Sequence, residues 1–106
     1  MASLNTHRSG SVRSIIFREK DEWFGVALEF NIVEVGDSPE EVMMLLDEAI
    51  KGYVESAQKA KLSVRTLNQK SDPVYEKLWE SQSKPHRKTG KQIYRVSSQP
   101  ISALVS

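Results

Sequence analysis

Gly36-Asp37-Ser38-Pro39-Glu40-Glu41 is the stretch that decides the fold, because an extended part of the chain gives way to a helix there. The Ser38 hydroxyl can accept a hydrogen bond from the first helical turn, and Pro39 suits the first helical position, where no amide donor is needed. Glu41 stands three residues after Ser38 and completes a capping box. The stretch therefore predicts a helix that begins at Pro39.

The residues after this start have the apolar spacing of an amphipathic helix. Apolar side chains recur three and four positions apart, at Val42, Leu45, Leu46, Ala49, Ile50, Tyr53, Val54 and Ala57. We expect the helix to end near Ala60, where Lys59 and Lys61 suit its negative end. Gly52 is unfavourable inside a helix, so it predicts close backbone packing at that point.

The residues before the stretch predict three strands. Ile15-Ile16-Phe17 and Trp23–Phe30 flank a charged turn, and the β-branched segment Ile32–Val35 follows Asn31, which favours a tight turn. In the second strand, alternation puts the even-numbered side chains on one face, which we expect to be the core face: Phe24, Val26, Leu28 and Phe30.

The chain after the long helix is less regular. Asp72-Pro73 can open a short helix near 73–81, and a further strand is expected near 92–97 or near 101–105. The whole pattern predicts an α+β fold in which a three- or four-stranded, mainly antiparallel sheet (β-β-β-α-β) is packed by one long helix. We divide the chain into a flexible arm (1–12) and a single domain (13–106), with a core at 13–60 and a basic extension at 61–106.

Composition excludes several classes of protein. The chain has 106 residues and no cysteine, which removes disulfide scaffolds, thiolate zinc sites and cysteine nucleophiles. No apolar segment approaches the about 20 residues that span a bilayer, and the first ten residues lack the apolar region of a signal peptide. We expect a cytoplasmic protein that makes no membrane contact.

The net charge of +1 hides an uneven distribution of charge along the chain. The segment 18–55 has a balance of −8, whereas the segment 56–106 has a balance of +7. An acidic body can meet a basic partner and a basic tail an acidic one, although the two parts can equally complement each other within one fold or dimer.

The middle of the chain resembles a known family. From Ile16 to about Ala57 it is similar to the N-terminal domain of HicB-type antitoxins, a small sheet-and-helix unit like a truncated ribonuclease H fold. The resemblance rests on Trp23-Phe24-Gly25-Val26-Ala27 and on Gly36 to Glu41, with Leu45 and Ala49 following. The chain departs from the family in having no proline between its second and third strands. Nothing after Ala60 predicts the two full helices of a DNA-binding domain.

The resemblance implies an antitoxin of a type II toxin-antitoxin system, a protein-binding domain that covers the RNA-binding face of a small basic RNA-cleaving toxin. Electrostatic complementarity would then speed the encounter and help select the partner. The candidate partner-binding residues are acidic: Glu19, Asp21, Glu22, Glu29, Glu34, Asp47 and Glu48.

The basic extension suggests an alternative, a stand-alone oligomeric domain that binds nucleic acid. The candidate residues combine phosphate-pairing charges with the nearby aromatic Tyr94; they are Lys84, Arg87, Lys88, Lys91 and Arg95. The apolar face of the short helix predicts a homodimer or a larger oligomer, with the interface at Tyr75, Leu78 and Trp79.

No pattern in the sequence favours an enzyme. His7 and His86 lie in polar segments, there is no Gly-x-Ser-x-Gly elbow, and five glycines supply no phosphate-binding loop. A ribonuclease-H-like activity needs carboxylates that converge on two metal ions, and no spacing indicates that Glu19, Glu29 and Asp47 do so. We therefore expect no catalytic residue, cofactor or metal.

Overall fold

The computed structural model describes residues 4–6, 9–81 and 92–104. Its main elements are β1 (Ser11–Glu19), β2 (Glu22–Ala27), β3 (Ile32–Gly36), α1 (Pro39–Lys59), α2 (Pro73–Ser81) and β4 (Gln92–Pro100). Short helical turns lie at η1 (Leu28–Phe30), η2 (Val64–Leu67) and α3 (Ile101–Leu104). The strands form one antiparallel sheet in the order β3-β2-β1-β4. The α+β prediction with one long and one short helix is thus confirmed.

The fourth strand comes from the first of the two C-terminal candidates. Gln92–Pro100 pairs with β1, whereas Ile101–Leu104 forms α3, so the alternative strand near 101–105 is wrong. A fully buried Ile101 explains the apolar character of that segment, because it packs into the core under α1. A register shift between Ile16 and Phe17 gives β4 one extra residue opposite β1.

The start of α1 follows the prediction. Ser38 Oγ accepts a hydrogen bond from the Glu41 amide at 3.2 Å, and Pro39 is the first helical residue. Glu41 Oε1 accepts in turn from the Asp37 amide at 3.0 Å, one residue before the amide that a capping box normally uses. The helix ends at Lys59 with Ala60 as its C-cap, where the sequence places its end.

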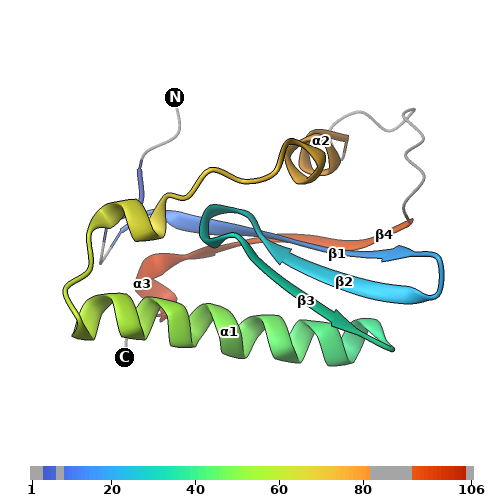
Figure 1. Cartoon of the computed structure of the whole chain (residues 1–106), viewed down its shortest axis with the longest axis horizontal. Coiled ribbons are helices and arrows are strands. Elements are labelled where there is room, and N and C mark those ends of the chain that lie inside the picture. Colours follow the sequence, from blue (N-terminus) through green and yellow to red (C-terminus); the bar gives the residue numbers. More distant parts are fainter. Residues whose placement is uncertain (1–3, 7–8, 82–91, 105–106) are drawn as a thin grey trace.

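The long helix α1 and the short helix α2 lie on opposite faces of the sheet (Figure 1). α1 packs chiefly on β2 and β3, and α2 packs chiefly on β1 from the other side. Two buried clusters result, one on each face. The cluster under α1 includes Val12, Ile16, Ala27, Val42, Leu46, Ile50 and Val54; the cluster under α2 includes Ile15, Phe17, Val26, Leu28 and Leu78.

The core face predicted for the second strand needs correction. The even-numbered Phe24 and Val26 pack in the α2 cluster, while the odd-numbered Gly25 and Ala27 lie under α1. The strand also stops at Ala27, and η1 sends Leu28 and Phe30 to different clusters. Asn31 ends η1 in the left-handed region with φ 56°, as expected of a tight turn. Alternation identified the two sides correctly, but both sides are covered.

Gly25, and not Gly52, is a glycine on which α1 packs closely, through the side chains of Val42 and Leu46. A Cβ built at Gly25 would lie 2.5 Å from Val42 Cγ1 and 3.1 Å from Ile16 Cδ1. At Gly52 a Cβ would meet nothing within 4 Å, because the residue is on the exposed side of α1. The close packing expected at Gly52 is therefore wrong, and the missing side chain of Gly25 lets α1 settle on β2.

Arg13 of β1 ties α2 to the sheet. Its guanidinium donates to both carboxylate oxygens of Glu76, at 2.9 and 2.8 Å, and its Nε donates to Glu29 at 2.5 Å. The same guanidinium lies 5.5 Å from the ring centre of Trp79. Hydrogen bonds from Arg13 hold the pKa of Glu76 below its usual value, against a partial burial that raises it. α2 is only nine residues long, so this contact helps to keep it docked.

The N-terminal residues are partly held in place. β1 begins at Ser11, inside the arm expected at 1–12. Asn5 is buried. Its side-chain oxygen accepts a hydrogen bond from the Ser11 amide at 2.6 Å, and its side-chain nitrogen donates one to the Leu67 carbonyl at 2.8 Å. The polar character of Asn5, which suggested a mobile arm, serves instead to satisfy backbone groups of two distant segments.

We predict opposite effects of alanine at the two glycines. Gly25→Ala should lower the free energy of unfolding by about 1–3 kcal/mol, because the new methyl group collides with the stiff side chain of Val42. Gly52→Ala, the matched control, should raise it by about 0.5–1 kcal/mol through helix propensity alone. Urea unfolding followed by circular dichroism measures both. A Gly25→Ala protein as stable as the parent would show that α1 does not depend on this close approach.

We also predict a pH dependence at Glu76. Since its pKa is lowered in the folded state, the carboxylate stabilises the fold above the ordinary pKa of 4.5, and this stabilisation is lost as the pH falls through the folded pKa. At pH 7, Glu76→Gln should unfold more easily than the parent by about 1 kcal/mol or less, as expected of a half-exposed ion pair. The difference in urea midpoint should shrink towards pH 3. A difference that stays constant with pH would contradict this assignment.

Candidate partner-binding surface

Carboxylates gather at the end of the molecule where the β1–β2 turn and the start of α1 meet. Glu19 pairs with Glu22 across the hairpin, and Trp23 pairs with Gly36, which brings the hairpin beside the residues that lead into α1. We call this region the acidic end; its carboxylates are Glu19, Asp21, Glu22, Asp37, Glu40 and Glu41. Arg18 and Lys20 are its described basic residues, so the local charge is strongly negative.

An apolar patch lies next to the acidic end, on the face of the sheet that carries α2. Val33 and Val35 of β3 are 44% and 45% exposed, and they pair with Val26 and Phe24 of β2. α2 packs on β1 and does not extend to these valines. Edge strand β3 therefore carries uncovered apolar side chains, a feature that marks interaction sites when polar residues surround it.

Glu19 and Glu22 border this patch. In β1 and β2 they stand two positions from Phe17 and Phe24, so their side chains leave the same face of the sheet. The rings of Phe17 and Phe24 stack on the same face with centres 5.3 Å apart, and Phe24 pairs with Val35. We define the apolar–acidic patch as Phe24, Val33 and Val35 with Glu19 and Glu22. An apolar centre with a charged border is the usual anatomy of a protein interface.

Three of the predicted acidic residues belong to this end, but Glu29 does not. Glu29 accepts from the Arg13 amide at 2.6 Å and from Arg13 Nε at 2.5 Å, and its side chain is only 18% exposed. Its carboxylate holds β1 and η1 together in the Arg13 contact. The expectation that Glu29 is an exposed acid is therefore wrong, because its carboxylate is paired with Arg13 inside the fold.

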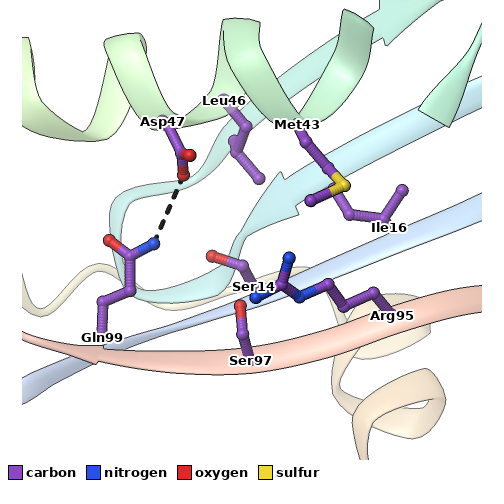
Figure 2. A pocket seen from close by; sticks show the side chains of 8 residues that line it. All are labelled: Ser14, Ile16, Met43, Leu46, Asp47, Arg95, Ser97 and Gln99. Atoms are coloured by element: carbon purple, nitrogen blue, oxygen red, sulfur yellow. Dashed lines mark hydrogen bonds between the residues drawn. The ribbon is translucent and has the colours of Figure 1, made fainter. Parts of the chain in front are cut away.

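The remaining predicted acids lie elsewhere. Glu34 is opposite Gly25 in the sheet, so it leaves the α1 face, away from the apolar–acidic patch. Asp47 accepts a hydrogen bond from Gln99 Nε2 at 3.3 Å, at a cleft between α1 and β4 (Figure 2). Glu48 is exposed on α1. The structure thus brings Glu19, Asp21 and Glu22 together and leaves Glu34, Asp47 and Glu48 apart from them.

Most of the predicted nucleic-acid-binding residues, Lys84, Arg87, Lys88 and Lys91, lie outside the described residues. Arg95 is described: it is exposed on β4 and lines the same cleft as Asp47.

The expected oligomer interface is used inside the chain. Leu78 is 3% exposed, and Tyr75 packs against Phe17 with ring centres 6.2 Å apart. Trp79 packs against the α2 cluster and under the guanidinium of Arg13. The apolar face of the short helix packs on the sheet of its own chain, which buries Leu78 and leaves Tyr75 and Trp79 half-buried, so a subunit interface at these three residues stays a prediction.

The apolar part of the patch was missed by the sequence reasoning, although a signal exists. The alternation of Val33-Glu34-Val35 puts both valines on one face of the strand, but it does not say whether that face is covered. The sequence does not show that β3 is an edge strand.

Within residues 4–6, 9–81 and 92–104, no three His, Asp or Glu side chains gather as a metal site would require. None of the described helices combines the length and the apolar character that crossing a membrane would need.

Comparison with known proteins leaves the family of the chain open. No protein-family model matches it, and neither curated proteins nor solved structures show a significant similarity to it. The function has to be argued from the surface itself.

Proposed function

We propose that this chain is a protein-binding domain of the HicB antitoxin type, which neutralises a small basic RNA-cleaving toxin by covering its RNA-binding face. The observation that carries the proposal is the apolar–acidic patch beside the acidic end. It offers a basic partner both apolar contact area and opposite charge on one continuous surface.

The two parts of the surface have different tasks. The carboxylates of the acidic end attract a basic protein over a distance, which raises the association rate and selects against acidic partners. Val33 and Val35 then supply apolar area that is removed from water in the complex. An RNA-binding face is basic because it contacts phosphates, so an acidic surface that occupies it competes directly with RNA.

The order of the elements agrees with this proposal. The order of elements, three strands, a long helix and a further strand, is the one that the resemblance to HicB-type antitoxins implies. Since one fold can host unrelated functions, the proposal depends on the surface and not on the fold.

The alternative function is nucleic-acid binding through the basic extension, and the experiment described below detects it as well. Of its candidate residues, Arg95 is the one in the described part of the chain.

The test is a native pull-down from the source cell with tagged protein at low and moderate salt, followed by reconstitution of the purified pair. We expect a basic protein of under about 100 residues whose RNA cleavage stops when this chain is added. The double variant Asp21→Lys/Glu22→Lys should weaken the complex at least about tenfold, mainly through a slower association rate.

The control is Glu48→Lys/Glu55→Lys, which changes the net charge equally on exposed positions of α1 outside the acidic end. It should leave the affinity nearly unchanged. Equal weakening by both variants would show that only net charge matters and would contradict the assigned surface. Recovery of nucleic acid without a basic protein would replace the proposal by the alternative.

A further inference from the structure

A second open region lies on the other face of the sheet, between α1 and β4. Because α1 packs over β2 and β3, it leaves a cleft above β1 and β4 (Figure 2). The cavity measures about 50 Å³, several times the space that a single water molecule requires. Its lining combines polar side chains with three apolar ones: Ser14, Asp47, Arg95, Ser97 and Gln99, with Ile16, Met43 and Leu46.

Ser14 supplies a buried hydroxyl that lacks a partner. The residue is 5% exposed, and within the described part of the chain its Oγ makes no hydrogen bond. It stands between Val12 and Ile16 on the core-facing side of β1, where an apolar residue would suit the packing. Buried hydroxyls are nearly always hydrogen-bonded, so the Ser14 hydroxyl indicates a place for a polar group in the cleft.

Arg95 supplies a positive charge at one end of the cleft. It pairs with Ile16 across the sheet, and Ser97 pairs with Ser14, so all four side chains leave the α1 face. In Figure 2 the guanidinium turns along β4 towards the two serines. Among the residues that the structure describes, no carboxylate forms a salt bridge with Arg95. A guanidinium and two hydroxyls form a donor set that suits a carboxylate.

Asp47 supplies a negative charge at the other end. Its Oδ1 accepts the 3.3 Å hydrogen bond from Gln99 and leaves acceptor capacity for a further donor. The apolar side chains of Met43 and Leu46, from the same helix, lie beside it (Figure 2). The cleft therefore holds a cation and an anion that are not joined to each other, with apolar contacts nearby.

We propose that this cleft binds a small zwitterion, a free α-amino acid with a small side chain such as glycine or alanine. The carboxylate lies against Arg95, Ser14 and Ser97, and the ammonium group lies against Asp47. A simple carboxylate leaves Asp47 unmatched, and a phosphate dianion is repelled by it. The site is separate from the apolar–acidic patch, so this inference does not depend on the proposed function.

The test compares ligands that carry one or both charged groups. Glycine and alanine are titrated into the ¹⁵N-labelled chain, with acetate and methylammonium as single-charge probes. We expect saturable shifts at the amides of Ser14, Asp47 and Ser97, with a Kd at or below about 1 mM for glycine. Acetate and methylammonium should bind at least about tenfold more weakly. Acetate that binds as tightly as glycine, or shifts spread over the whole surface, would overturn the proposal.

Variants identify the contacts. Ser14→Ala, Arg95→Gln and Asp47→Asn should each raise the Kd for glycine about tenfold, since each removes one hydrogen-bonding group from the charged ligand. Arg18→Gln and Glu48→Gln make the same charge changes outside the cleft and should leave it unchanged. Ser14→Ala separates binding from folding, because loss of an unpaired hydroxyl should not lower the melting temperature of the free chain. If Ser14→Ala and Asp47→Asn bind glycine as tightly as the parent chain does, the proposed binding site is contradicted.

Discussion

The close approach of α1 to β2 at Gly25 is the constraint on which the rest of the packing depends. With no side chain at this position, Val42 and Leu46 can enter the sheet surface beside Ile16. The helix consequently lies over β2 and β3 and leaves the β4 side of the same face less covered. The polar lining at Ser14 and the open cleft above it are consequences of where the helix sits.

Signals that act between near neighbours made much of the fold predictable. The start of α1 depends on Ser38, Pro39 and Glu41, which lie within a single turn, so their order in the sequence was sufficient. One core face was expected for the second strand, whereas both of its faces are covered, because alternation separates two faces but does not say how many of them are buried. The choice of Gln92–Pro100 as the fourth strand needed the register with β1, which no local pattern contains.

The candidate surface was predictable to the same limited extent. Asp21 lies in the turn between β1 and β2 and Glu22 is the first residue of β2, so the exposure of both could be expected from the charged turn in the sequence. Glu29 was misassigned because its partner, Arg13, lies 16 residues earlier and on a neighbouring strand. The exposure of Val33 and Val35 depends on the place of β3 at the sheet edge, a property of the whole sheet.

The two helices cover the sheet unevenly, and this offset explains why two different open surfaces exist. α1 lies towards β3 on one face, and α2 lies on β1 on the other, so each face keeps a part that its helix does not reach. The part beside Val35 is exposed strand surface with a carboxylate border, a composition suited to another protein. The part above Ser14 is a small polar cavity that excludes a protein surface by its size. Since the sheet lies between them, a ligand in one leaves the other free.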